Sequence, residues 1–122
     1  MFNDILIIDD DHSNLKLLSR FLQKRGYHIS TATSAEEGLD LIADQPPDVL
    51  LLDLKLPGMD GLKFTSLLRR NEVTKHIIVI AVTSYENAFD EEKAIKAGCN
   101  GYIVKPINIF TLSEKLQDYL QN

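Results

Sequence analysis

Short apolar runs alternate with longer amphipathic segments along the chain, and this alternation constrains the fold more than any other feature. Two of the runs, Ile5–Ile8 and Val49–Leu52, are apolar throughout and are the length of a strand. Such runs are typical of parallel strands that are buried on both faces. Because helical patterns separate the runs, the sequence predicts an α/β domain with a parallel sheet and crossover helices.

We predict five strand–helix units. The strands are expected at 5–8, 27–32, 49–52, 77–82 and 102–104, and the fourth and fifth helices at 87–97 and 108–122. Gly26 has the position of a glycine that ends a helix, and Ser34 with Glu37 forms a capping box. One helical arc of the first helix is formed by the apolar residues Leu15, Leu17, Leu18, Phe21 and Leu22. The second and third helices carry the apolar residues Leu39, Leu41, Ile42, Leu62, Phe64, Leu67 and Leu68. In the last helix we expect the inward residues to be Ile109, Phe110, Leu112, Leu116 and Leu120.

Length, charge and cysteine content exclude several classes of protein. The 122 residues correspond to a single domain, 1–122. The formal net charge of −5 argues against nonspecific binding to nucleic acid. Cys99 is the only cysteine, so the chain has no internal disulfide and suits a reducing compartment. Without a signal peptide or a membrane-length apolar run, we expect a cytoplasmic protein with no membrane or direct nucleic-acid partner.

Polar residues follow several of the predicted strands. The carboxyl ends of parallel strands meet at one edge of an open sheet, where ligands bind. Taken singly, each residue has an ordinary explanation as a turn former, a helix cap or a surface lysine, and Asp11 is expected to cap the first helix. Their convergence on one edge is what predicts a site. The residues are Asp9, Asp10, Asp11, Asp53, Thr83, Ser84 and Lys105.

Four segments in this order resemble the receiver domains of bacterial two-component response regulators. They are Ile7-Ile8-Asp9-Asp10-Asp11, Leu51-Leu52-Asp53-Leu54-Lys55-Leu56-Pro57-Gly58-Met59-Asp60-Gly61, Ala81-Val82-Thr83-Ser84 and Gly101-Tyr102-Ile103-Val104-Lys105-Pro106. The resemblance implies a flavodoxin-like, three-layer (βα)5 fold with strand order 2-1-3-4-5. Because the sequence ends in the fifth predicted helix, about where a receiver ends, we expect a single receiver domain without an output domain.

The resemblance assigns the chemistry to Asp53, which would accept a phosphoryl group from a phosphohistidine. Mg²⁺ would be held by Asp10, Asp53 and the backbone carbonyl of Lys55, with Asp9 acting largely through water. The donor would be a sensor histidine kinase or a histidine phosphotransfer protein. The chain would catalyse its own phosphorylation and dephosphorylation, but it would serve as a signalling switch, not as an enzyme.

The hydroxyl of Thr83 and the ammonium of Lys105 would hold the other phosphoryl oxygens. Phosphorylation adds about one unit of negative charge, which can draw Thr83 and Lys105 inward. Tyr102 has the position of the family's switch aromatic and would move into the space released. The bond between Lys105 and Pro106 would be cis. The signal would pass to a downstream protein by direct contact, from a monomer or a phosphorylation-dependent dimer.

Four further residues are assigned roles through the same resemblance. Lys55 and Tyr85 flank the phosphorylation site and are large enough to screen it from water, which predicts slow self-dephosphorylation. Leu15 and Leu22 lie at one margin of the first helix's apolar arc, where we expect them to be half exposed. A phosphohistidine-bearing helical bundle would dock there, or the two leucines are residues at the edge of the core.

Two other functions remain open at this point. A haloacid-dehalogenase-like phosphatase also begins with a strand and Asp-x-Asp, in which case Asp9 would be the nucleophile. That class needs a further acidic pair after a later strand, and only Glu114 and Asp118 follow Lys105, in a helical pattern. A pseudo-receiver would keep the fold without the phosphorylation chemistry, although every residue needed for that chemistry is present.

Overall fold

The computed structural model describes residues 3–56, 58–84 and 88–120, in which strands and helices alternate in five pairs. The predicted strands and helices are confirmed, with ends that differ by only a few residues. In chain order they are β1 (Asp4–Ile8), α1 (His12–Lys24), β2 (His28–Ala32), α2 (Ala35–Asp44), β3 (Val49–Asp53), α3 (Gly61–Arg70), β4 (Ile78–Ser84), α4 (Ala88–Ala97), β5 (Gly101–Lys105) and α5 (Ile109–Leu120).

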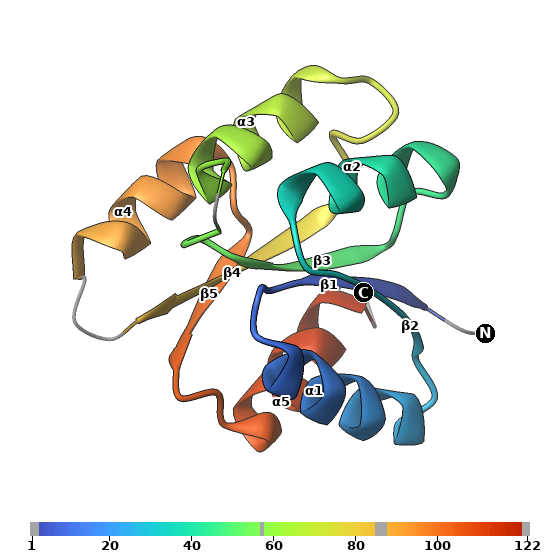
Figure 1. The fold of residues 1–122 in the computed structure, drawn as a ribbon. Helices are drawn as coiled ribbons and strands as arrows, with labels where there is room; N and C mark the ends of the chain where they lie inside the picture. Colours follow the sequence, from blue (N-terminus) through green and yellow to red (C-terminus); the bar gives the residue numbers. More distant parts are fainter. Residues whose placement is uncertain (1–2, 57, 85–87, 121–122) are drawn as a thin grey trace.

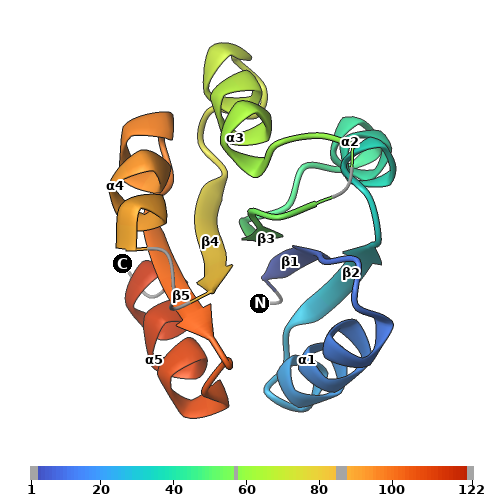
Figure 2. The ribbon, with the colours of Figure 1, turned by 60° about the vertical axis from the view of Figure 1, so that its left-hand side comes forward.

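All neighbouring strands are parallel, in the order β2-β1-β3-β4-β5. This order is the one that the sequence resemblance implied. Helices α2, α3 and α4 cover one face of the sheet and α1 and α5 the other, which gives three layers (Figures 1 and 2). The register pairs Ile8 with Leu52 and Asp53 with Val82, so the carboxyl ends of the central strands lie side by side.

The central strands are apolar throughout because both of their faces are covered. In β1, Leu6 and Ile8 belong to the core beneath α2, α3 and α4, whereas Ile5 and Ile7 belong to the core beneath α1 and α5. Every residue of β3 is buried, including its last residue, Asp53. Burying an apolar side chain of this size contributes about 2 kcal/mol, so the two cores fix β1 and β3 firmly.

Phe110, which we expected to point inward, is 66% exposed, so that prediction was wrong. Leu17, on the apolar arc of α1, and Leu67, in α3, are exposed as well, at 60% and 45%. In α1 the buried stripe consists of Leu15, Leu18 and Leu22, at the spacing of one helix face. Leu17 lies outside this stripe.

The expected half exposure of Leu15 and Leu22 was also wrong. Leu15 is 6% exposed and Leu22 is fully buried. Both pack into the core between α1, α5 and the sheet. They form the centre of the buried face of α1, not its margin, because the sheet lies directly under that stripe.

The helix caps agree with the sequence, with one difference. The backbone N–H of Glu37 donates to the Oγ of Ser34, the N-cap of α2, at 3.2 Å. The Glu37 carboxylate accepts from the N–H of Thr33, one residue before the position that a standard capping box uses. Gly26 and Gly98 follow α1 and α4 with positive φ angles.

Candidate functional site

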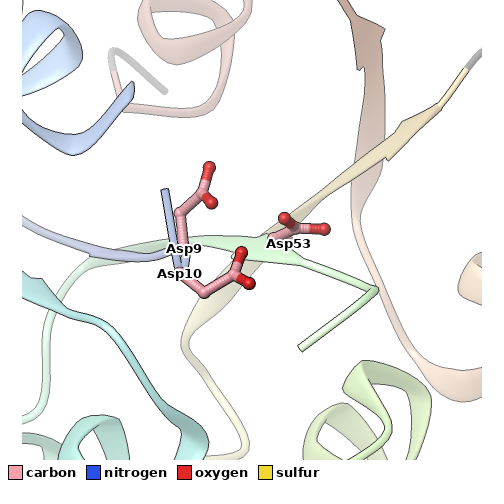
Figure 3. A group of neighbouring side chains, drawn as sticks. All are labelled: Asp9, Asp10 and Asp53. Atoms are coloured by element: carbon pink, nitrogen blue, oxygen red, sulfur yellow. The ribbon is translucent and has the colours of Figure 1, made fainter. Parts of the chain in front are cut away.

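Three carboxylates meet at the carboxyl end of the sheet. Asp9 and Asp10 follow β1, and Asp53 ends β3 (Figure 3). One oxygen of each of the three lies within 4.8 Å of the others. Asp9 and Asp53 are buried, whereas Asp10 is exposed. The predicted convergence of these acids is therefore confirmed.

The Asp9 carboxylate is held by a donor at each oxygen. The backbone N–H of Asp11 donates to Oδ1 at 2.9 Å, and the side-chain Nδ2 of Asn14 donates to Oδ2 at 3.1 Å. Asp11 is the N-cap of α1, as expected, and accepts from the N–H groups of Ser13 and Asn14. Burial raises the pKa of Asp9, and the two hydrogen bonds and the Lys105 charge offset part of that rise.

Asp53 is paired with Lys105, which ends β5. The Lys105 ammonium lies 3.0 Å from Oδ2 of Asp53 and 3.9 Å from Oδ2 of Asp9. Partial burial disfavours the charged ammonium, but the hydrogen bond and charge of Asp53, with the charges of Asp9 and Asp10, outweigh it and raise the pKa of Lys105. The peptide bond between Lys105 and Pro106 is cis.

Thr83 lies within β4, one residue before the strand ends. It is 3% exposed, and its Oγ1 has no hydrogen-bond partner among the residues that the structure describes. Buried hydroxyl groups in proteins nearly always have a partner, and leaving one without costs about 1–3 kcal/mol. The hydroxyl is therefore available to a ligand oxygen.

The segment after Asp53 is held by hydrogen bonds and by close packing. The N–H of Lys55 donates to Oδ1 of Asp53 at 3.0 Å, while the Lys55 side chain is exposed. Gly61, the first residue of α3, packs directly on this segment: a Cβ there would lie 2.8 Å from the Leu54 Cα and 3.3 Å from the Asp53 carbonyl oxygen. Only glycine permits this approach, which places the start of α3 against the backbone of Asp53.

Tyr102 lies in β5, next to α4 and α5. The nearby carboxylate of Glu91 in α4 raises the pKa of Tyr102, through hydrogen bonding to the phenol and through its negative charge. The ammonium of Lys115 in α5 lies 5.8 Å from the centre of the ring. The side chain is half-buried and packs against the core beneath α4. Tyr85, the other aromatic residue named from the sequence, lies outside the described residues.

The donors at this edge fit Mg²⁺. That ion prefers oxygen ligands, keeps several waters and is bound through one or two carboxylates together with phosphate oxygens. In the described part of the chain the exposed Asp10 carboxylate accepts no hydrogen bond, so both of its oxygens are open to a cation. Asp9 and Asp53 supply further carboxylate oxygens close by.

Sequence reasoning missed Asn14. It is the only side chain among the described residues that donates a hydrogen bond to Asp9. A signal existed, because an asparagine in the first turn of a helix that follows an acidic turn can reach back to that turn. Leu15 and Leu22, by contrast, contribute to the core and not to this site.

No helix in the described ranges is long and apolar enough to cross a membrane. After β5 those ranges contain only α5, so the later strand that the phosphatase alternative requires is not found there.

The sequence profile described as "Response regulator receiver domain" matches residues 5–117. The polar-differentiation response regulator DivK of Brucella ovis is 37% identical over 120 residues, covering 98% of both chains. A candidate response regulator from Chloroflexus aurantiacus has a similar structure, with a TM-score of 0.95 and 30% identity over all of both chains. The chemotaxis response regulator CheY4 of Vibrio cholerae has a TM-score of 0.91 and 28% identity, covering 98% of this chain and all of that one. This chain belongs to the response regulator receiver domains, the phosphoacceptor family of two-component signalling.

Proposed function

We propose that Asp53 is the phosphoacceptor of this receiver and that it takes the phosphoryl group from a phosphohistidine. The observation that carries the proposal is the environment of its carboxylate: buried at the end of β3, 3.0 Å from the Lys105 ammonium and beside two further acids. Asp9 is also buried, but its Oδ2 lies 3.9 Å from the same ammonium, beyond an ordinary hydrogen bond, and it follows β1, whereas Asp53 ends the central strand β3.

In the reaction, an oxygen of the Asp53 carboxylate attacks phosphorus. The bond between phosphorus and the donor's imidazole nitrogen breaks, and that nitrogen keeps the electron pair. The transferring group resembles metaphosphate, so positioned positive charge and hydrogen-bond donors lower the barrier. Lys105 supplies the charge, and the unpartnered hydroxyl of Thr83 supplies a donor. Mg²⁺, held by Asp9, Asp10, Asp53 and the Lys55 carbonyl, would neutralise further charge on the phosphoryl oxygens.

Phosphorylation changes the contacts that hold this edge. Lys105 loses part of its attraction to the Asp53 carboxylate and gains a phosphoryl oxygen, and Thr83 gains the partner that its hydroxyl lacks. Movement of Thr83 shifts the end of β4 and so the start of α4. Tyr102 packs beside α4, where Glu91 acts on its hydroxyl, so a shift of α4 would free the tyrosine to move and would alter the surface offered to a downstream protein.

The phosphodonor is proposed to be a histidine kinase or phosphotransfer protein that docks over α1. Because Leu15 and Leu22 are buried, the apolar contact would come from Leu17, which is 60% exposed. The segment 12–27 holds four basic residues and no acidic one, in a chain whose net charge is −5. In the described part of the chain, Lys16 and Arg20 of this segment form no ion pair. A donor with acidic groups around its histidine would fit this surface.

The proposal includes a long-lived phosphorylated state. The exposed Lys55 side chain follows the phosphorylation site by two residues, and Tyr85 follows Thr83 by two residues. If these side chains screen the acyl phosphate from water, Lys55→Asn and Tyr85→Ala hydrolyse it faster than the unaltered chain. Equal hydrolysis rates would refute the screening.

The experiment that tests the phosphoacceptor is incubation with acetyl phosphate, with and without Mg²⁺, followed by borohydride trapping and mass spectrometry. We expect an adduct at Asp53 that requires Mg²⁺ and is absent from Asp53→Asn. Asp48→Asn, which changes an exposed acid at the other end of the sheet, serves as the matched control and should be modified normally. An adduct at Asp9 would favour the phosphatase reaction, and no adduct on folded protein would favour a pseudo-receiver.

A further inference from the structure

The side chain of Asn14 connects α1 to the acid cluster. Its Nδ2 donates to Oδ2 of Asp9 at 3.1 Å, while the other Asp9 oxygen accepts from the backbone N–H of Asp11. Asp9 is 3% exposed, so bulk water has little access to its carboxylate. The orientation of that carboxylate is thus set by these donors and by the nearby Lys105 and Asp53.

The Asn14 hydrogen bond is not needed to begin the helix. The Asp11 carboxylate caps α1 by accepting from the backbone N–H groups of Ser13 and Asn14. These bonds use the main chain of Asn14 and would persist with almost any side chain at that position. The side-chain amide of Asn14 takes no part in the cap and instead donates a hydrogen bond to Asp9.

The oxygen that Asn14 holds is also the one nearest to Lys105. Oδ2 of Asp9 lies 3.9 Å from the Lys105 ammonium, which is beyond an ordinary hydrogen bond, whereas Oδ2 of Asp53 lies 3.0 Å from it. Without the amide donor, Asp9 would have one fewer restraint against turning toward the ammonium. Two acids would then compete for one lysine, and the metal would lose an oriented carboxylate.

We infer that Asn14 is a positioning residue for cation binding: its side-chain amide holds Oδ2 of Asp9, keeps that oxygen from closing the 3.9 Å gap to the Lys105 ammonium, and so leaves the carboxylate available to Mg²⁺. The inference rests on the proposed function, because it assumes that Mg²⁺ binds among Asp9, Asp10 and Asp53. It adds a residue on α1 to the elements that build this site. Hydrogen-bond partners of metal-binding carboxylates commonly have this effect, and their loss weakens metal affinity about 10- to 100-fold.

The test measures Mg²⁺ affinity directly, by following the backbone amide signals of Asp10 and Asp53 in NMR titrations. Asn14→Leu removes the donor at similar volume and should weaken Mg²⁺ binding about tenfold. Asn14→Ala is a second variant without the donor and should behave alike, whereas Asn14→Gln keeps an amide and should recover most of the affinity. Ser13→Ala, in the same exposed turn, is the matched control and should bind as the unaltered chain does.

The role of Lys105 is tested by combining the variants. In a Lys105→Met background the competing ammonium is gone, so Asn14→Leu should weaken Mg²⁺ binding less than about threefold. An undiminished tenfold loss in that background would overturn the mechanism. Equal affinity of Asn14→Leu and the unaltered chain would overturn the inference while leaving the proposed function intact. Failure of the unaltered chain to bind Mg²⁺ would overturn both.

Discussion

The two ends of the sheet differ in whether their polar groups have hydrogen-bond partners. At the carboxyl end, two buried acids lie close together and the Thr83 hydroxyl has no partner among the described residues. At the amino end, the Arg69 guanidinium donates to three backbone carbonyls and one side-chain oxygen. Its acceptors lie at 2.7–2.9 Å: Gly98 O, Lys75 O, Ile77 O and Asn100 Oδ1.

Asn100 extends the amino-end network to the other side of the sheet. Its side-chain oxygen also accepts from the N–H of Val79, and its carbonyl accepts from the hydroxyl of Tyr119 in α5 at 2.7 Å. Gly98 has φ +112, and a Cβ there would lie 2.8 Å from the Cγ of Arg69. Arg69 therefore packs across a position that favours glycine, and it joins α3, β4 and the segment between α4 and β5.

The amino end of the sheet therefore contributes mainly to stability, and the carboxyl end mainly to function. The amino end holds satisfied polar groups and fastens the carboxyl-terminal end of α4. The carboxyl end leaves groups unsatisfied until a cation and a phosphoryl group arrive, and this costs stability in the unliganded state.

Arg69→Ala should lower the free energy of unfolding by about 3 kcal/mol, because several carbonyls lose a charged donor. Guanidinium unfolding measures this change, and Mg²⁺ affinity should stay the same. Arg70→Ala changes the exposed neighbouring residue and should leave stability within about 0.5 kcal/mol. A large loss of Mg²⁺ affinity in folded Arg69→Ala would show that the two ends are not separate.

Mg²⁺ binding at the carboxyl end of the sheet should raise the free energy of unfolding of the unaltered chain. At a concentration one hundred times its dissociation constant, the gain in unfolding free energy is about 2.7 kcal/mol. Asp10→Asn removes the exposed carboxylate and should abolish most of the gain, as calorimetry with and without Mg²⁺ can determine. Asp44→Asn, an exposed acid on α2, should keep it.

Thr83→Val should raise the free energy of unfolding by about 1 kcal/mol, because a methyl group replaces a buried hydroxyl without a partner. The same variant should be phosphorylated by acetyl phosphate about tenfold more slowly or worse, since it loses a donor to the phosphoryl group. Thr83→Ser retains the hydroxyl and separates the two effects. A Thr83→Val protein that is both less stable and fully active would contradict the comparison.

The smallest effect is expected from the exposed ion pair at the amino end. The Nδ1 of His28 lies 3.0 Å from Asp4, with 67% of the histidine side chain exposed. His28→Ala should change the unfolding free energy by less than about 0.5 kcal/mol. A change as large as that of Arg69→Ala would show that surface pairs, and not the Arg69 network, fasten this end.

Sequence patterns predicted the fold and the position of the acid cluster because both depend on strand ends. Once β1 and β3 are parallel neighbours, Asp9 and Asp53 must lie together, whatever their side chains do. The exposure of Leu17 and Phe110 could not be predicted in the same way. Periodicity shows that a helix has an apolar side, but the sheet beneath it decides where the centre of that side lies.

The contacts of Arg69 and Asn14 were not predicted, for a different reason. Arg69 reaches carbonyls and an asparagine up to 31 residues away, through a side chain whose direction no local pattern specifies. Asn14 contacts an acid only five residues away, but a first-turn asparagine is equally compatible with exposure to solvent. These individual side-chain hydrogen bonds could be identified only from the folded structure.

The close contact of Gly61 with the backbone of Leu54 and Asp53 predicts that substitutions at position 61 impair signalling. Even alanine at position 61 would push on the main chain that carries the phosphoacceptor, and a displacement of about 1 Å at a reacting group can slow a reaction a hundredfold. We expect selections for lost signalling to recover substitutions at Gly61 whose protein accumulates at normal levels. From the sequence alone, such substitutions would be taken for regulatory ones. The actual defect would be a misaligned carboxylate at Asp53.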